Sequence, residues 1–269
     1  GVFRRQRQMC IRDSGRTTLN GEGLQHQDGH SHLFSATIPN CLSYDPAYAY
    51  ELAVIFQHGI QKMFVELENY YYYITVTNEN YEQPAKPEGS DEGIIKGMYR
   101  LIENKEHQVI LLGSGSILNE SVKAVEILSS VGILAEVWSV TSFNMLRKDG
   151  IDKQRFNELN PDLLSKVSYV EECLSNESIP FIASTDYMRA YPEQIRSYIK
   201  APFYTLGTDG YGRSDSREKL REFFEIDANN IARIAAYALF KRGAMTKTEI
   251  NKIYKKFKVN PAKPNPWEV

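Results

Sequence analysis

The sequence predicts an α/β protein built from two consecutive units. A chain of 269 residues is long enough for two domains of ordinary size. Short apolar or β-branched runs alternate with segments of helical periodicity, which is the pattern of alternating strands and helices. One composition shift, at residues 84–90 (Pro-Ala-Lys-Pro-Glu-Gly-Ser), is typical of an interdomain linker. We therefore expect a first unit that ends at residue 85 and a second unit that covers residues 86–269.

Composition and charge are those of a cytoplasmic globular protein and exclude several functional classes. Hydrophobic residues make up 42% of the chain and charged residues 25%, as is usual for soluble domains. A net charge of −2 gives no electrostatic footprint for nucleic acid or an anionic membrane. Three cysteines, Cys10, Cys41 and Cys173, lie far apart and favour a reducing compartment over a disulfide framework. No apolar run approaches the length of a membrane span, and no secretory signal is visible.

The first unit is expected to contain two strands and a helix. Residues 1–13 are basic and lack periodicity, so we expect them to be disordered or foreign to the protein. Residues 40–43 are expected to form a buried strand. Asp45, which is followed by proline, has the chemistry of an N-cap and predicts a helix that continues to residue 60. Residues 70–76 are aromatic and β-branched, which predicts a second strand.

The second unit begins with the order strand, turn, helix, strand. Residues 109–112 form a continuous apolar run, the pattern of a strand buried on both faces. The glycines of residues 113–116 turn the chain into an amphipathic helix at 117–128, and a strand follows at 136–140. This order predicts a right-handed βαβ unit with parallel strands. The remaining expected elements are strands at 179–184 and 204–207, helices at 192–199, 227–241 and 246–258, and an extended tail at 261–269.

A polar stretch at residues 14–32 is the first candidate for chemistry. It contains three of the five histidines, four glycines, and the carboxylates of Glu22 and Asp28, and no period of 3.6 or 2 passes through it. The stretch therefore reads as a loop that can approach a ligand closely. Glu22 and His26 are the pair that we expect to act together. A histidine can donate to a substrate oxygen and move a proton near neutral pH, and a neighbouring glutamate supports its charged form.

The same stretch has two other interpretations. His26, His30 and His32, with Asp28 between them, have residue types that bind zinc, although no distant fourth ligand stands out. Alternatively, these histidines form hydrogen bonds to loop carbonyl groups and have only a structural role.

Two glycine-containing segments after strands are further candidates. Residues 113–118 resemble the start of a dinucleotide-binding loop, but leucine stands at the third glycine position and Glu136 falls at the start of the next strand. A tight strand-to-helix turn is the better interpretation. Residues 207–217 (Gly-Thr-Asp-Gly-Tyr-Gly-Arg-Ser-Asp-Ser-Arg) could bind an anion or contact another subunit, or could be a solvated loop. The tyrosines at 70–73 favour strand packing over stacking on a ligand ring.

The motifs along the chain resemble those of the homodimeric type of pyruvate dehydrogenase E1 component. The likeness begins at residues 15–26 (Gly-Arg-Thr-Thr-Leu-Asn-Gly-Glu-Gly-Leu-Gln-His) and continues through Asp28-Gly-His-Ser-His32. Further matching motifs lie at residues 38–51, 71–74, 78–81, 112–117, 139–143, 183–188 and 206–217. The resemblance implies that residues 14–85 are the last part of an aminopyrimidine-binding α/β domain. It also implies that residues 86–269 form a complete transketolase C-terminal-like α/β domain with a mostly parallel sheet.

The resemblance also implies a reaction, its cofactors and its partners. Members of this family use thiamine diphosphate and Mg²⁺ to decarboxylate pyruvate, and they pass the acetyl unit to a lipoyl group of the E2 component. The implied partners are a second E1 subunit and E2, and neither nucleic acid nor a membrane is implied. Carried onto this sequence, His26 faces pyruvate and Glu22 supports it, and relatives often carry glutamate where Gln27 stands. The implied loop support comes from Gln25, Asp28, His30 and His32.

Part of the expected catalytic apparatus has no counterpart in the sequence. The Gly-Asp-Gly…Asn type of motif that holds the diphosphate and Mg²⁺ does not occur, and the glutamate that activates the aminopyrimidine is not matched. We therefore assign no cofactor-binding or metal-binding residue, and we expect this polypeptide by itself neither to bind the cofactor tightly nor to turn over. Alternative functions are a zinc-dependent hydrolase using His26, His30 and His32, a non-catalytic dimerisation or docking module at residues 86–269, and a transketolase-type activity.

Overall fold

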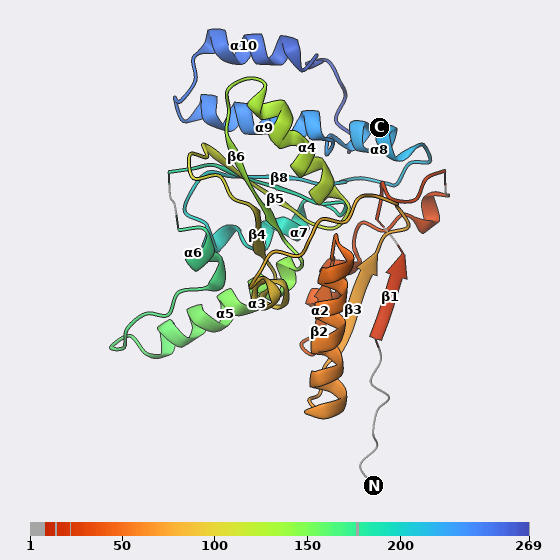
Figure 1. Ribbon diagram of the computed structural model, residues 1–269, viewed down its shortest axis with the longest axis vertical. Helices are drawn as coiled ribbons and strands as arrows, with labels where there is room; N and C mark the ends of the chain where they lie inside the picture. The colour runs from red at the N-terminus through yellow and green to blue at the C-terminus, as the bar shows by residue number, and fades with distance from the viewer. Residues whose placement is uncertain (1–8, 14, 22, 176–177, 269) are drawn as a thin grey trace.

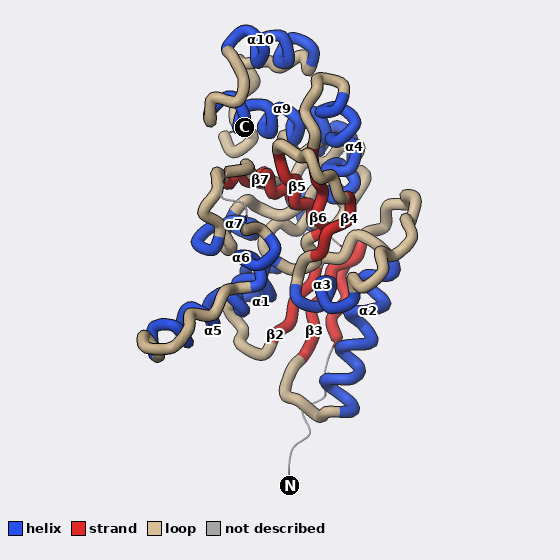
Figure 2. Tube along the Cα trace, turned by 60° about the vertical axis from the view of Figure 1, so that its left-hand side comes forward, coloured by secondary structure: helices blue, strands red, loops and turns tan. Residues whose placement is uncertain are grey.

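The computed structural model describes residues 9–13, 15–21, 23–175 and 178–268, and strands in this part of the chain form two sheets (Figure 1). A three-stranded sheet lies in the first unit and a five-stranded sheet in the second. In Figure 2 the strands of the smaller sheet lie below those of the larger one, and helices surround both. All strand pairs are parallel except one, and this confirms the predicted α/β class with a mostly parallel sheet.

The smaller sheet has the strand order β1-β3-β2 and is parallel throughout. β2 (Cys41–Tyr44) and β3 (Tyr71–Val76) are the two strands that the sequence predicts. They are connected by helix α2 (Ala49–Ile60) and a π-helical turn, η2 (Gln61–Val65). Side chains from α2 and both strands form one core, which includes Tyr44, Ile55, Met63, Tyr72 and Ile74.

Strand β1 (Met9–Asp13) corrects one expectation from the sequence. It pairs in parallel with β3, with Met9 opposite Tyr72 and Asp13 opposite Val76, so disorder is the wrong prediction for these five residues. The edge of β3 offers a row of backbone N–H and C=O groups, and a neighbouring segment can satisfy them whatever its own periodicity. Residues 1–8, which carry the rest of that expectation, lie outside the described residues.

The start of helix α2 also differs from the prediction. The N-cap is Tyr48 rather than Asp45, and the carboxylate of Glu51 accepts hydrogen bonds from the backbone N–H groups of Ala47 (2.6 Å) and Tyr48 (3.0 Å). A glutamate in the first turn therefore satisfies the donors that an N-cap aspartate would otherwise serve. The side chain of Asp45 does not cap α2 and instead contacts Ser114 of the second unit.

The larger sheet has the strand order β4-β6-β5-β7-β8. β5 (Val109–Gly113), α4 (Ile117–Ser129) and β6 (Ala135–Ser139) form the predicted βαβ unit with parallel strands. β7 (Phe181–Ser184) and β8 (Phe203–Leu206) continue the sheet on the other side of β5. The sequence did not indicate β4 (Tyr99–Ile102), an edge strand that pairs antiparallel with β6 across an irregular register.

Helices cover both faces of the larger sheet (Figure 1). On one face, α4 packs with α9 (Ala228–Lys241), α8 (Arg217–Phe224) and α10 (Lys247–Lys256) around an apolar cluster. On the other face lie α5 (Phe143–Leu159), α6 (Tyr169–Cys173) and α7 (Ala190–Glu193). This double cover explains why β5 is apolar on both sides and why β5 and β6 are buried along their length.

Three smaller differences concern the second unit. The expected helix at 192–199 is divided into α7 and a 3₁₀ turn, η3 (Arg196–Tyr198). Residues 261–268 contain two turns rather than a fully extended tail. A short helix, α3 (Asp91–Lys96), follows the proline-containing stretch and packs against α2. Among the described helices, none combines the length and apolar character that crossing a bilayer requires.

Candidate functional site

Residues 15–21 and 23–30 of the polar stretch lie against the larger sheet, at the edge where β7 ends. Asp186 follows β7 and its carboxylate accepts two hydrogen bonds through Oδ1, from Thr17 N (3.1 Å) and Thr17 Oγ1 (2.6 Å). Thr18 Oγ1 donates to Oδ2 of the same carboxylate at 2.8 Å. These three donors on a buried carboxylate anchor the beginning of the loop to the second unit.

The middle and end of the loop have further anchors on the second unit. The side-chain amide of Gln27 exchanges two hydrogen bonds with the peptide groups of Arg213. The carbonyl oxygen of Gly29 accepts a hydrogen bond from Met188 N at 3.1 Å. Gly21 N donates to Asp215 O at 3.1 Å. The loop is therefore held along its length by residues that follow β7 and β8.

The larger sheet has a topological switch point between β5 and β7. From β5 the chain passes through α4 to β6, and from β7 it passes through α7 to β8, which lies on the opposite side. In open α/β sheets the crevice at such a point, outside the carboxyl ends of the strands, is the usual place for a ligand. At the switch point of this sheet, Ser114 and Thr185 face each other, with their hydroxyl oxygens 3.2 Å apart.

Asp45 from the first unit lies at this switch point. Ser114 Oγ donates to its carboxylate at 2.7 Å, and Gly115 N donates to its carbonyl oxygen at 3.1 Å. Gly115 has φ +51°, and a Cβ at that position would lie 2.5 Å from Asp45 Oδ2. The carboxyl group therefore lies close to the turn that precedes α4, where it is held by the Ser114 hydroxyl. Residues 113–116 form the predicted tight turn between β5 and α4.

The two buried carboxyl groups of this interface have perturbed acidity. Burial raises the pKa of Asp45 to about 7, against the opposing effect of hydrogen bonds from Thr75 and Ser114. Burial also raises the pKa of Asp186 above its ordinary value, and the hydrogen bonds from Thr17 oppose the shift. Both groups sit where water cannot solvate a charge, so each needs its hydroxyl partners.

His26 has a different environment. It ends a 3₁₀ turn, η1 (Leu24–His26), that follows Gly23 and in which no residue is buried. Its imidazole is exposed and forms no hydrogen bond with the described part of the chain. Gln25 is exposed beside it. Glu22, the other member of the predicted pair, lies outside the described residues. The imidazole of His26 is therefore accessible to a ligand from solvent.

The other polar residues of the loop are structural in this chain. His32 is fully buried in helix α1 (Ser31–Ala36), where its ring stacks on Tyr191 and its Nε2 lies 3.0 Å from Thr75 Oγ1. Burial lowers the pKa of His32 to about 3, so the ring is neutral. Asp28 Oδ1 accepts hydrogen bonds from the N–H groups of His30 (2.9 Å) and Ser31 (3.0 Å) at the start of α1.

These positions correct one expectation and bear on another. Residues 31 and 32 belong to a helix and not to the loop, because Asp28 satisfies the donors at its first turn and tyrosines pack around His32. The positions of the three histidines also disfavour the zinc interpretation. His32 is enclosed in the core, His30 Nδ1 lies 3.5 Å from Arg16 Nη2, and His26 faces solvent. Across residues 9–13, 15–21, 23–175 and 178–268, no group of three or more potential ligands is arranged to hold a metal ion.

Residues 207–217 contact the first unit of the same chain. Arg217 Nε donates to Thr18 O at 2.7 Å, and Arg16 donates to Gly210 O. Within the segment, Asp209 accepts a hydrogen bond from Arg189 N at 2.8 Å. The solvated-loop interpretation therefore does not hold for this segment, although Tyr211 at its tip is 84% exposed.

Sequence reasoning missed the polar residues that join the two units. Thr75 lies near the carboxyl end of β3, Ser114 directly follows β5, and Asp186 lies two residues after β7. A signal was present for Ser114 and Asp186, because polar residues that follow neighbouring parallel strands meet at one edge of a sheet. A second missed link is the buried guanidinium of Arg221. Its Nη1 lies 3.1 Å from Glu79 Oε1 of the first unit.

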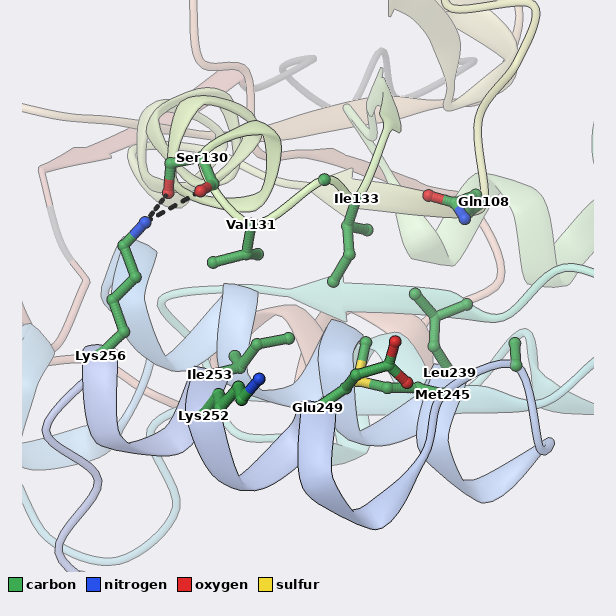
Figure 3. Close-up of a pocket in the computed structure, with 12 residues that line it drawn as sticks. Gln108, Ser130, Val131, Ile133, Leu239, Met245, Glu249, Lys252, Ile253 and Lys256 are labelled. Carbon is green, nitrogen blue, oxygen red and sulfur yellow. Dashed lines mark hydrogen bonds between the residues drawn. The ribbon is translucent and has the colours of Figure 1, made fainter.

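A separate pocket lies between α9, α10 and the turn that leads from α4 to β6 (Figure 3). Its volume is about 440 Å³. Lys256 on α10 reaches across it and donates to Ser130 O (2.9 Å) and Ser130 Oγ (3.0 Å). Apolar side chains line the space between them: Val131, Ile133, Leu239, Met245 and Ile253. No residue of the 15–32 loop belongs to this pocket.

Comparison with known proteins identifies two family models along the chain. The model described as the pyruvate dehydrogenase E1 component middle domain matches residues 5–84. The model described as the transketolase-like C-terminal domain matches residues 97–227. These ranges leave residues 85–96 between them, around the composition shift at 84–90. The domain boundary itself stays a prediction.

Curated relatives match nearly the whole chain. A pyruvate dehydrogenase E1 component from Pseudomonas aeruginosa is 55% identical over 260 residues, which are 95% of this chain and 30% of the relative. The corresponding protein from Escherichia coli K12 is 53% identical over 258 residues, 94% of this chain and 29% of the relative. The chain therefore spans about 30% of the length of the curated relatives that it matches.

Solved structures of lower identity share the fold. A transketolase mutant from Pichia stipitis superposes with a TM-score of 0.64 at 19% identity, covering 87% of this chain and 30% of that one. The transketolase of Leishmania mexicana gives a TM-score of 0.61 at 18% identity and covers 95% of this chain and 31% of that one. Both superpositions support the arrangement of the two sheets and their helices.

Proposed function

This chain belongs to the pyruvate dehydrogenase E1 component family, as its C-terminal portion, and from this premise we propose that it contributes His26 to the decarboxylation of pyruvate in a complete subunit. The observation that carries the proposal is the exposed imidazole on the turn at residues 24–26, held against the second unit by anchored neighbours on both sides. A loop that is fixed at its ends and presents one free titratable side chain is suited to meet a ligand.

His26 would act on the oxygen atoms of the keto acid. A neutral or protonated imidazole donates a hydrogen bond to a carboxylate or carbonyl oxygen, and it can hold or move a proton at that oxygen near neutral pH. We propose that Glu22 supports the imidazole in this role. His32 has no place in the proposal, because its ring is buried and neutral.

We propose that this chain by itself does not hold thiamine diphosphate and Mg²⁺. The described residues offer no cluster of potential metal ligands, and the Ser114 hydroxyl at the switch point of the larger sheet already donates to Asp45. We therefore propose that groups outside this chain hold both cofactors in the complete subunit. Transfer of the acetyl unit to a lipoyl group of E2, association with a second E1 subunit, and a cytoplasmic location belong to the same proposal.

The test of His26 uses the complete subunit. His26→Ala should depress pyruvate turnover and leave the thermal unfolding midpoint unchanged, because the imidazole is exposed and has no partner in the described chain. His107→Ala, at a half-buried histidine before β5, is the matched control and should retain turnover. Unchanged turnover in His26→Ala would remove this residue from the mechanism.

The expected dependence on groups outside the chain has its own test. Calorimetric titration of the 269-residue chain with thiamine diphosphate and Mg²⁺ should show no micromolar binding. A complete subunit, titrated under the same conditions, is the positive control. Micromolar binding by the 269-residue chain would refute the proposal that groups outside this chain hold the cofactor.

A further inference from the structure

The side chain of Gln27 forms a paired contact with the backbone of the second unit. Gln27 Nε2 donates to Arg213 O at 2.5 Å, and Gln27 Oε1 accepts from Arg213 N at 2.8 Å. The side chain is 8% exposed, although it lies next to the exposed His26. An amide is the side-chain group that satisfies a peptide N–H and a peptide C=O together, because it carries both a donor and an acceptor.

This contact is the nearest anchor of the His26 turn. Residues 24–26 have no buried side chain, so no packing holds them from within. Gln27 N closes the turn by donating to Leu24 O at 3.2 Å. The position of the turn therefore depends on Gln27, whose side chain is fixed by a residue 186 positions away in the sequence.

The partner segment is shaped to receive the amide. Gly212 precedes Arg213, and a Cβ at Gly212 would lie 2.6 Å from Gln27 Oε1 and 3.0 Å from Gln27 Cβ. The absence of a side chain there lets the amide reach the peptide groups. The segment is itself anchored at both ends, by Asp209 on Arg189 N and by Arg217 on Thr18 O. The segment is therefore fixed by contacts other than the one that it makes with Gln27.

We propose that Gln27 is a positioning residue through which residues 207–217 of the second unit hold the His26 turn, so that this unit sets where the imidazole points. The proposal rests on the proposed role of His26, but the contact between Gln27 and Arg213 can be tested without it. The proposal gives the second unit, in which we have placed no catalytic residue, the role of orienting His26.

The first measurement is amide hydrogen exchange of residues 23–27 in the 269-residue chain. Gln27→Leu keeps the approximate volume and removes both hydrogen bonds, so exchange in the turn should be at least about fivefold faster. Gly212→Ala disturbs the same contact from the opposite side and should have the same effect. Gln57→Leu, at an exposed position on α2, is the matched control and should leave exchange in the turn unchanged. Unchanged exchange in both Gln27→Leu and Gly212→Ala would overturn the proposal.

The second measurement is pyruvate turnover by the complete subunit carrying the same substitutions. Both contact variants should lower kcat at least about tenfold and change KM by less than about twofold, because misplacing a catalytic group lowers the rate more than the affinity. Unchanged kcat with accelerated exchange would show that the contact orders the turn without positioning the imidazole, and this would overturn the proposal. A wild-type subunit that does not turn over pyruvate would instead refute the proposed function, while the exchange result still decides whether the contact orders the turn.

A pH profile separates positioning from a general loss of stability. The carboxyl group introduced by Gln27→Glu can make both hydrogen bonds only when it is protonated, because an ionised carboxylate cannot donate to Arg213 O. Burial raises the pKa of a carboxyl group at such a place. In this variant, protection of the turn and kcat should therefore fall together as the pH rises, relative to wild type. A pH-independent ratio of variant to wild type would contradict the paired contact.

Discussion

Replacing Asp45 by asparagine is expected to make the protein more stable at alkaline pH than it is with the native residue. The carboxyl group is buried between the two units, where Thr75 and Ser114 each donate to it at 2.7 Å. Burial raises its pKa from 3.8 to about 7. Above that pH the folded protein must hold a charge that water cannot reach, whereas the unfolded chain solvates it freely.

The sign and size of the effect follow from this shift. Because the pKa is higher in the folded state, the stability contributed by the protonated group is complete below about pH 4 and is lost as the pH rises through about 7. A shift of about 3 pKa units corresponds to about 4 kcal/mol at 1.36 kcal/mol per unit. Asparagine resembles the protonated carboxyl group in shape and has an NH₂ donor, so Asp45→Asn should escape this loss.

The assay is urea unfolding of both proteins at pH 5 and pH 8. We expect the variant to exceed wild type by about 2–4 kcal/mol at pH 8, and we expect less than half of that difference at pH 5. Asp162→Asn, at an exposed carboxylate, is the control and should give the same difference at both pH values. A wild-type protein that is as stable as the variant at pH 8, or more stable, would show that Asp45 is ionised without loss of stability and would refute the reasoning.

Three further substitutions test other contacts of the fold. Gly115→Ala should destabilise by at least about 2 kcal/mol in urea unfolding, because φ is +51° and the new Cβ would lie 2.5 Å from Asp45 Oδ2. Gly132→Ala, with φ +78° and open space around it, should lose about 1 kcal/mol, and equal losses would argue against the close approach. Asp186→Ala should destabilise by about 2–4 kcal/mol, because three donors of Thr17 and Thr18 lose their acceptor; a loss below 1 kcal/mol in the same assay would contradict this role. Ser168→Ala removes the N-cap of α6 and should lower the unfolding free energy by about 1 kcal/mol, and an unchanged value would show that Glu171 suffices.

The elements with strong local patterns could be predicted from the sequence. The continuous apolar run before Gly113 predicts a strand covered on both faces, and β5 is buried along its length. The helical spacing of apolar residues predicts α4 and α9, and both helices bury that face in one cluster. The polar loop with His26 could be found as well, because glycine and titratable residues gather there without periodicity.

Partners far apart in the sequence were decided only by the tertiary structure. Asp45 has the local chemistry of an N-cap, but it lies in the crevice of the second sheet and bonds to Ser114. His32 belongs to the same polar motif as His26, yet it is buried against Tyr191 while His26 is exposed. Periodicity and capping depend on a few neighbouring residues and can therefore be read locally. Which side chains meet across the two units depends on how the sheets are placed against each other, and no local pattern contains that information.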